Sequence, residues 1–363
     1  MNDFFSVFSK VEDFRVKGRC LHQLSEILGL VLIGVLADCD DFCEIADYGR
    51  GNISFLRDEL GFEFNNGIPS EDTLERVFKY LKTSELSNSY KQFLGDLSLS
   101  DKQIAIDGKE LRSTIPTGKK HALVQMVNVW VVESGLSFGQ YRVDKKSNEI
   151  TAIPALLTQI DCQGAVVSID AIGCQKLIVE QICEQKADYV IALKENQTAL
   201  YEQVEQEMYL EQSHLPTYEC SQNKHGREET RKITISTQMK WIDNKEEWKG
   251  LGSVVMVERN RVIKGVVENT KKYYISSLTN KTAAQMLTYI RNHWGIENGL
   301  HWQLDLTFRE DDAKLRNETA IINLHQVRKW ALVLLKRIPE KISIKRKRKK
   351  AHRDNQYLKK IFT

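Results

Sequence analysis

Three carboxylates occupy positions from which the surrounding sequence could bring them together. Asp107 ends a short apolar run, and Asp170 ends the apolar run Val166–Ile169. Both runs are typical of short buried strands, and side chains at the carboxyl ends of such strands leave the core and meet solvent. Glu297 lies in a segment with helical spacing that could pack on the same sheet. Three converging carboxylates repel one another unless divalent cations lie between them, and all-oxygen ligands suit Mg²⁺ or Mn²⁺.

Each of these carboxylates also has an ordinary structural interpretation. An isolated Asp after a strand is most often a turn or cap residue, and a Glu on a helix is most often solvated. The apolar flanking residues nevertheless predict a buried helix around Glu297, where an unpaired carboxylate would be costly. They are Trp294, Ile296, Leu300 and Trp302. His293 and His301 share a helical face with Glu297, which raises the alternative of a zinc site. Eight residues of helix separate the two histidines by about 12 Å, so one zinc ion cannot bind both.

The elements expected around these residues divide the chain into three parts. Apolar residues recur at helical intervals from Leu21 to Leu97, without an alternating strand pattern. We therefore expect an N-terminal all-helical domain at residues 1–98. A catalytic domain at residues 99–340 and a basic C-terminal tail at residues 341–363 would follow it.

The middle of the chain has the pattern of a mixed sheet covered by helices, which is an α/β fold. The region from about 215 to 278 interrupts the alternation with three strand-like runs, so we expect a β-rich insertion there. The strands expected before the insertion are residues 103–107, 123–132, 136–143, 165–170 and 189–193, and the expected helices are residues 151–160 and 175–185.

Composition narrows the class of protein only a little. The chain has 52 Lys and Arg residues against 49 Asp and Glu, and this net charge of +3 is too small to identify a partner. Positive charge is concentrated at Lys345–Lys350, which favours non-specific phosphate binding, although such runs are usually solvated tails. Seven cysteines without a CxxC pair predict reduced thiols in a cytoplasmic protein. The apolar stretch Ile27–Ala37 is shorter than the roughly 20 residues of a membrane span.

Six sequence blocks are weak evidence singly but specific in combination, because they occur in one characteristic order. They are Asp107–Arg112, Lys146–Pro154, Ile169–Gln175, Ala192–Gln197, His225–Arg231 and His293–Asp305. In this order they resemble the DDE insertion-sequence transposases, in particular the H-repeat-associated proteins. The segments Gly67–Ser70 and Arg76–Phe78 are similar to the helical domain associated with that family, so the resemblance extends over nearly the whole chain.

The resemblance implies an RNase H-like catalytic domain, with helices on both faces of a mixed sheet and a β-rich insertion. It makes Asp107, Asp170 and Glu297 both the catalytic residues and the ligands of two Mg²⁺ or Mn²⁺ ions. Such an enzyme would cleave DNA at transposon ends and transfer the freed strand into target DNA. Its partners would be the terminal inverted repeats and the target, both double-stranded DNA, and it would act as a homodimer on DNA.

The sequence departs from the family pattern beside the catalytic glutamate. Related transposases carry an Arg four residues before it and a Lys seven residues after it, where this chain has His293 and Leu304. Other residues must therefore hold the DNA phosphates, and each candidate could equally be an ordinary surface charge or solvated loop residue. The candidates are Lys109, Arg112, His225, Arg227, Arg231, Arg291, His293 and His301.

Two other functions remain open from the sequence. A catalytically silent remnant would keep the fold and bind DNA, although retention of all three carboxylates argues against it. A structure-specific nuclease with an RNase H-like fold would cut DNA with the same residues and never join ends.

Overall fold

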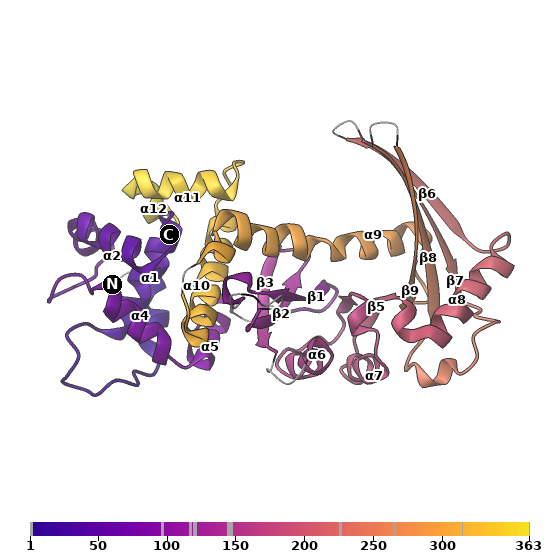
Figure 1. Cartoon of the computed structure of the whole chain (residues 1–363), viewed down its shortest axis with the longest axis horizontal. Helices are drawn as coiled ribbons and strands as arrows, with labels where there is room; N and C mark the ends of the chain where they lie inside the picture. The colour runs from indigo at the N-terminus through magenta and orange to yellow at the C-terminus, as the bar shows by residue number, and fades with distance from the viewer. Residues whose placement is uncertain are drawn as a thin grey trace. The chain divides into compact units, whose positions relative to one another are not determined.

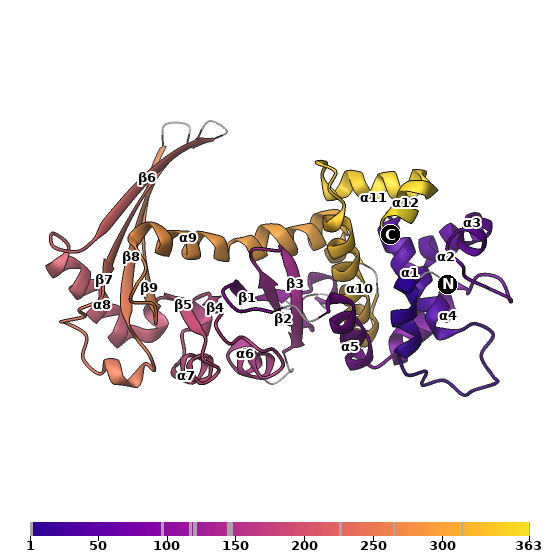
Figure 2. The same cartoon turned by 180° about the vertical axis from the view of Figure 1, so that it is seen from behind.

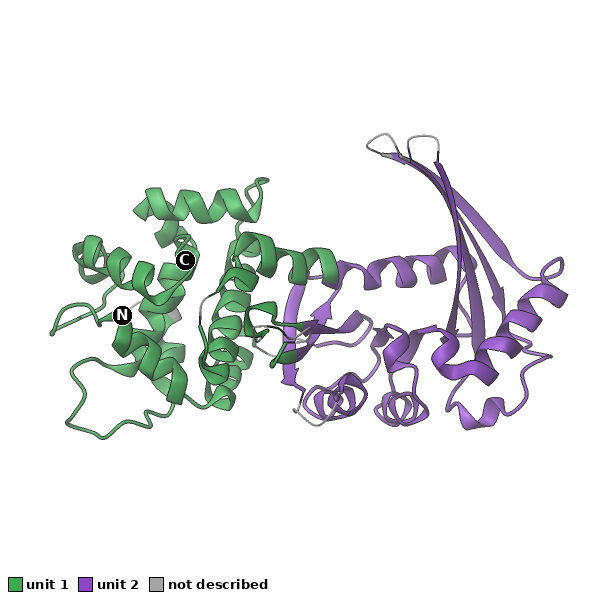
Figure 3. Ribbon diagram, in the orientation of Figure 1, with its two compact units in different colours: residues 1–97, 110–125, 297–363 green, residues 98–109, 126–296 purple. Residues whose placement is uncertain are grey.

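The structure is a computed structural model that divides into two compact units (Figure 3). Unit 1 comprises residues 1–97, 110–125 and 297–363, and unit 2 comprises residues 98–109 and 126–296. Unit 2 is therefore inserted in the sequence of unit 1. The residues that the structure describes are 3–95, 98–115, 118, 122–143, 148–224, 227–263, 266–313 and 315–362.

The N-terminal part of unit 1 is helical, as the spacing of apolar residues predicts. Residues 3–95 contain no strand. Helix α1 is apolar around its whole circumference and is buried almost completely. Its long apolar sequence therefore reflects burial inside unit 1, as expected for a helix that is hydrophobic on all sides. The elements are η1 (Asp3–Lys10), α1 (Leu24–Leu36), α2 (Phe42–Gly51), α3 (Ile53–Asp58), α4 (Glu71–Tyr80) and α5 (Thr83–Leu94).

The C-terminal part of unit 1 is built around one long helix. Helix α10 (Glu318–Arg337) is buried over most of its length and packs on α1, α4 and α5. The rings of Phe8 and Tyr90 contact Trp330 of this helix, with centroids 4.9 and 5.5 Å away. The other elements are η2 (Arg112–Thr114), η6 (Glu297–His301), η7 (Gln303–Thr307), η8 (Glu310–Asp312), α11 (Ile344–Arg353) and α12 (Asn355–Lys360).

The segment expected to be a basic tail is instead folded. It forms α11 and α12. Two of its cations, Lys347 and Arg348, are buried and donate hydrogen bonds to backbone carbonyl oxygens, which stabilises this folded arrangement. Arg348 donates to the carbonyl oxygens of Val35 and Cys39, at 2.9 and 3.1 Å. Lys347 donates to Leu335 at 2.8 Å. The helical period leaves the neighbouring cations, such as Lys349, exposed.

Unit 2 contains a nine-stranded sheet in the order β3-β2-β1-β4-β5-β9-β8-β7-β6. Strands β1, β4 and β5 are parallel to one another, and β9, β8, β7 and β6 continue the sheet from β5 as an antiparallel series. The strands are β1 (Gln103–Glu110), β2 (Gln125–Val131), β3 (Leu136–Arg142), β4 (Val166–Ile169), β5 (Asp188–Leu193), β6 (Thr217–Lys224), β7 (Arg227–Ser236), β8 (Ser253–Ile263) and β9 (Val266–Ser276).

Helices lie on both faces of this sheet (Figures 1 and 2). Helix α9 (Ala283–His293) contacts β4, β6 and β7 from one face, whereas α6 (Glu149–Leu157) and α7 (Lys176–Glu184) lie on the other. The fold is thus mixed α/β, as the sequence predicts. The remaining helix is α8 (Thr198–Glu211), and the short turns are η3 (Ala171–Gly173), η4 (Glu195–Gln197) and η5 (Lys245–Glu247).

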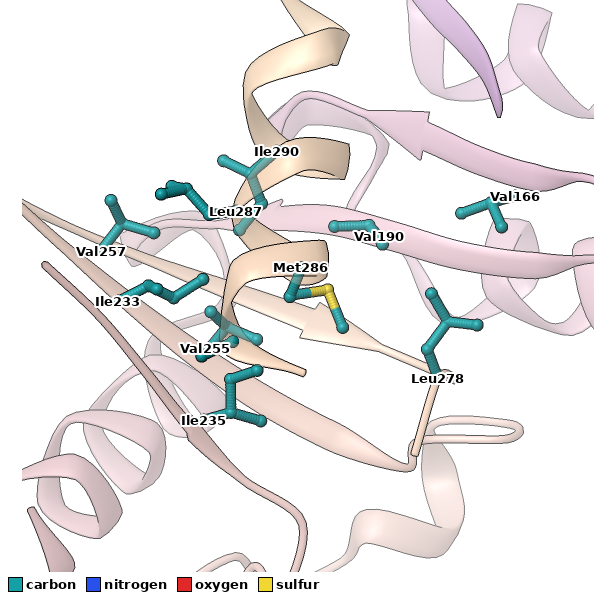
Figure 4. Close-up of a cluster of buried hydrophobic side chains, with 11 residues drawn as sticks. Val166, Val190, Ile233, Ile235, Val255, Val257, Leu278, Met286, Leu287 and Ile290 are labelled. Carbon is teal, nitrogen blue, oxygen red and sulfur yellow. The ribbon is translucent and has the colours of Figure 1, made fainter. Parts of the chain in front are cut away.

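The expected β-rich insertion is present as strands β6 to β9. These strands extend the central sheet rather than forming a sheet of their own, because β9 pairs with β5 from Val190 to Leu193. A buried apolar cluster fixes α9 on this extension (Figure 4). It consists of Val166, Val190, Ile233, Ile235, Val255, Val257, Leu278, Ala283, Met286, Leu287 and Ile290.

Candidate active site

Asp107 and Asp170 lie at corresponding positions of two adjacent parallel strands. The last paired residues of β1 and β4 are Ile106 and Ile169, and each aspartate is the next residue of its chain segment. Adjacent strands are about 4.8 Å apart, so the two backbones are close where the aspartates branch from them. The aspartates therefore share one edge of the sheet, at its carboxyl end.

The alternation of side chains along a strand decides which face the aspartates share. Ala105 pairs with Ser168 across β1 and β4, and each aspartate is two residues further along its strand. Side chains two residues apart point to the same face. The ring of His293, at the end of α9, lies 3.2 Å from the Ser168 hydroxyl. Both aspartates therefore point to the face that α9 covers.

A buried polar network holds α9 on this part of the sheet. The amide nitrogen of Gln103 donates to Ser168 Oγ at 3.1 Å and to the carbonyl oxygen of Tyr289 at 2.7 Å. The Ser168 hydroxyl donates its one proton to the carbonyl oxygen of Ile104. Ser168 Oγ must then accept from Nδ1 of His293, which identifies the ring nitrogen that carries a proton. The sequence analysis missed Gln103 and Ser168, although polar residues inside otherwise apolar strands are a recognisable signal.

Each aspartate accepts a hydrogen bond from a nearby backbone nitrogen, but only Asp170 caps a turn, because β1 continues past Asp107 to Glu110 and the expected turn after Asp107 is absent. Asp170 Oδ1 accepts from the backbone nitrogen of Ile172 at 3.1 Å and so begins η3. Asp107 Oδ1 accepts from Gly108 at 2.9 Å. Such a bond to a backbone nitrogen is the ordinary structural role of an Asp that follows an apolar strand run, and it fixes the orientation of the carboxylate.

A further carboxylate belongs to the same neighbourhood. The carboxyl group of Glu149, in the first turn of α6, lies directly against the backbone of Gly108, so a Cβ atom at position 108 would overlap it. Only glycine allows this approach. The sequence contained Glu149 in a family block but gave no reason to place it beside Asp107.

Glu297 begins the π-helical turn η6 in unit 1. Its side chain is 50% exposed, and Oε2 lies 3.6 Å from Nδ1 of the buried His301. Trp294 and Trp302 are also about half exposed. The expectation of a buried helix was therefore correct for Ile296 and Leu300, which are fully buried, and wrong for Trp294 and Trp302.

The candidate phosphate-binding residues have different environments. Arg112 is exposed, whereas the side chain of Lys109 is buried. Arg231 and Arg291 line one cavity of unit 2. His225 lies outside the described residues, and Arg227 begins β7, where only its backbone is described.

Comparisons with known proteins agree with this arrangement of elements. The family model described as Transposase DDE domain matches residues 99–334, and the model described as DDE_Tnp_1-associated matches residues 5–94. The H repeat-associated putative transposase YhhI of Escherichia coli K12 is 36% identical over 361 residues, which cover 96% of this chain and 95% of YhhI. Putative transposase YncI of Escherichia coli O157:H7 is 34% identical over 370 residues, which cover 99% of this chain and 93% of YncI.

These matches define the class of protein. The chain belongs to the family of DDE transposases that includes the H repeat-associated proteins. Proteins of this family generally use divalent metal ions and act on DNA. In the part of the chain that the structure describes, no helix combines the length and the apolar composition needed to cross a membrane.

Proposed function

We propose that this chain is a DNA transposase that cleaves DNA at transposon ends and transfers the freed strand into target DNA. The observation that carries the proposal is the position of Asp107 and Asp170, which directly follow paired residues of two parallel strands. Glu297 is the proposed third acidic residue. It follows His293 by one helical turn, and His293 is bonded to β4 two residues before Asp170.

The proposed site fits a hard divalent cation. Its donors are carboxylate oxygens from different elements, which suit Mg²⁺ or Mn²⁺ and not a softer metal. Asp107, Asp170 and Glu297 would hold two such ions. When bound, the ions would lower the pKa of the attacking water and stabilise the leaving 3′-oxygen. Zinc is a poorer fit, because zinc sites favour histidine and cysteine ligands, whereas the three donors proposed here are carboxylates.

The main contribution of the protein's own residues would be to orient the acidic side chains. Hydrogen bonds from Gly108 and Ile172 fix one oxygen of each aspartate. The buried ring of His301 lies 3.6 Å from Oε2 of Glu297, within ion-pair distance if the ring is protonated. Holding the acidic groups still in advance avoids reorganisation when the attacking and leaving oxygens are brought into line.

We further propose an RNase H-like catalytic core, a homodimer on DNA and a cytoplasmic protein. The order of the first five strands, with β1, β4 and β5 parallel, supports the core. The seven free cysteine thiols support the proposed cytoplasmic location, because disulfides are rare in that compartment. The ligands would be terminal inverted repeats and target DNA.

Among the proposed phosphate contacts, exposure favours Arg112 and Arg291, and Arg231 is favoured by its position in the lining of a cavity. Burial disfavours a direct contact from Lys109. The bonds of His293 and His301 favour positioning roles for these two residues. His225 and Arg227 keep their proposed roles on the strength of the family block alone.

One relative gives the silent-remnant alternative some weight. The Escherichia coli K12 protein named Inactive transposase YbfQ is 37% identical over 65 residues, which cover 18% of this chain. The three carboxylates present here oppose that alternative. The nuclease alternative differs only in lacking strand joining.

A strand-transfer assay separates these functions. The substrates are paired DNA ends carrying the inverted repeats that flank the gene, with plasmid target and Mg²⁺. We expect joined products from the parent and none from Asp170→Asn or Glu297→Gln, although both variants should fold and bind DNA. Cleavage without joining would indicate the nuclease, and binding without cleavage would indicate the remnant. Joining by Glu297→Gln at the parent rate would remove Glu297 from the site.

A further inference from the structure

A cationic cavity opens between α9 and the β7–β9 part of the sheet, inside unit 2. Its volume is about 310 Å³. Four of the side chains that line it are positively charged, and the indole ring of Trp294 lies at its edge. We call it the cationic groove and define it by Arg231, Arg259, Lys272 and Arg291.

The register of the strands places two of these cations directly opposite each other. Arg231 of β7 pairs with Arg259 of β8, and the next row on the same face pairs Ile233 with Val257. That next row is buried beneath α9. Like charges directly opposite on neighbouring strands oppose folding, so the arginine row is not explained by the stability of the sheet.

The carboxylates nearby do not satisfy the two arginines. Glu229 lies 2.6 Å from Arg231 and 3.8 Å from Arg259, and Glu268 also lies 3.8 Å from Arg259. The two arginines therefore share Glu229, and both ion pairs of Arg259 are long. Arg231 Nη1 and Arg259 Nε are buried and have no hydrogen-bond partner among the described residues. A buried donor without an acceptor is costly, and an anion with several oxygens would provide the missing acceptors.

The other two cations of the groove, Lys272 and Arg291, are neutralised even less by nearby carboxylates. Within the described part of the chain, Lys272 has no carboxylate within ion-pair distance, and its ammonium lies 5.4 Å from the centre of the Trp294 ring. Burial lowers the pKa of Lys272, and the charges of Arg259 and Lys194 lower it further. Arg291 donates to the neutral side-chain amide of Gln222, at 3.3 Å, and pairs with no carboxylate among the residues that the structure describes.

We propose that the cationic groove binds backbone phosphates of DNA, independently of base sequence. This inference rests on the proposed function, which supplies DNA as the ligand. Guanidinium groups match phosphate oxygens in geometry and charge. The groove also lies on the face that carries Asp107 and Asp170, and Arg291 is two residues before His293, which bonds to β4. DNA that follows α9 would therefore contact both regions.

The residues next to the groove provide a matched control. Arg231 and Lys272 point into the groove, whereas their neighbours Lys232 and Lys271 belong to the row that contains Glu258, on the opposite face of the same strands. The double variant Arg231→Gln/Lys272→Gln removes two charges from the groove. The double variant Lys232→Gln/Lys271→Gln removes two charges from the other face.

Fluorescence anisotropy with duplex DNA, at several NaCl concentrations and without metal, measures the contribution of the groove. We expect the groove variant to bind all sequences about 10- to 100-fold more weakly, with the salt slope reduced by about 2, since each phosphate contributes about 0.9. The control variant should bind as the parent does. Equal losses in both variants, or none in the groove variant, would overturn the inference. Competition by polyglutamate as effective as that by duplex DNA would also overturn it.

The result is independent of the proposed catalytic activity. Binding is measured without metal, so a parent protein that binds through the groove but never cuts DNA would contradict only the proposed function. If the parent cuts and joins DNA but the groove variant binds DNA as tightly as the parent does, the result would contradict only the proposed role of the groove. Circular dichroism and thermal melting check that each variant is folded.

Discussion

Two regions on the α9 face of the sheet in unit 2 concentrate charge of opposite sign. At the carboxyl ends of β1 and β4, Asp107 and Asp170 follow paired strand residues. On β7 and β8, Arg231 and Arg259 are paired directly. Both arrangements place like charges on neighbouring strands, where folding alone would favour opposite charges. The comparison is the reason for the two proposals, in which a divalent cation would complete the acidic region and a DNA phosphate would complete the basic one.

The largest effect should follow a charge change in the acidic region. Asp170→Asn keeps the shape and the bond to Ile172 but removes the negative charge. We expect DNA cleavage in Mg²⁺ to fall about 10³-fold, as for other groups that stabilise a transition state. The control variant Asp161→Asn changes an exposed residue that precedes β4, and it should cleave DNA at the parent rate. Equal cleavage rates for the parent and Asp170→Asn would contradict the proposed catalytic role of the acidic region.

The next effect concerns the apolar packing on which both regions depend. Leu287 of α9 is 3% exposed and belongs to the cluster beneath the helix. Leu287→Ala should lower the free energy of unfolding by about 2–4 kcal/mol, through lost burial and the cavity left behind. Urea unfolding followed by circular dichroism measures this change. Leu177→Ala, at a position 75% exposed, should change it by less than about 0.5 kcal/mol.

A smaller effect should follow removal of the Ser168 hydroxyl. Ser168→Ala leaves the donors of Gln103 and His293 without their shared acceptor. We expect a loss of about 1–3 kcal/mol in unfolding free energy. The same urea titration tests this, with Ser221→Ala in an exposed strand position as the control. Equal stabilities of the two variants would show that the network does not hold α9.

The smallest effect is a pH dependence of the basic region. Because the pKa of Lys272 lies below its ordinary value of 10.5, this lysine loses its charge at a lower pH than an exposed lysine does. Without DNA, stability should rise with pH between the lowered pKa and 10.5, since the unfolded chain binds more protons there. DNA affinity should fall over the same interval. Lys272→Arg should abolish that fall, whereas Lys271→Arg should keep it.

The acidic region was predictable because its signals are local. An apolar run that ends in Asp identifies the end of β4 and the place where β1 stops pairing with β4, although β1 itself continues to Glu110. The helix-strand alternation places β1 and β4 in one sheet. Three of the four strands of the insertion were visible in the same way, whereas β6 was not predicted. The positions of Glu149, Gln103 and Ser168 were not, because they depend on which elements pack together.

The basic region could not be predicted as a unit. Arg231 and Arg291 were candidates separately, but their common cavity depends on the register of β7 and β8 and on the packing of α9. Arg259 and Lys272 resemble ordinary strand charges in the sequence. Composition also misled at residues 345–350, where the basic run hid a helical pattern in which Lys347 and Arg348 face inward.

The burial of Arg348 has a consequence for the synthesis of the protein. Its guanidinium group bonds to carbonyl oxygens at the end of α1 and in the turn after it, more than 300 residues earlier in the chain. Those carbonyl oxygens remain without this partner until the ribosome has translated α11. A message cut short before that helix would therefore yield a product whose first helices cannot complete their hydrogen bonds, and such a product should be degraded before it reaches DNA.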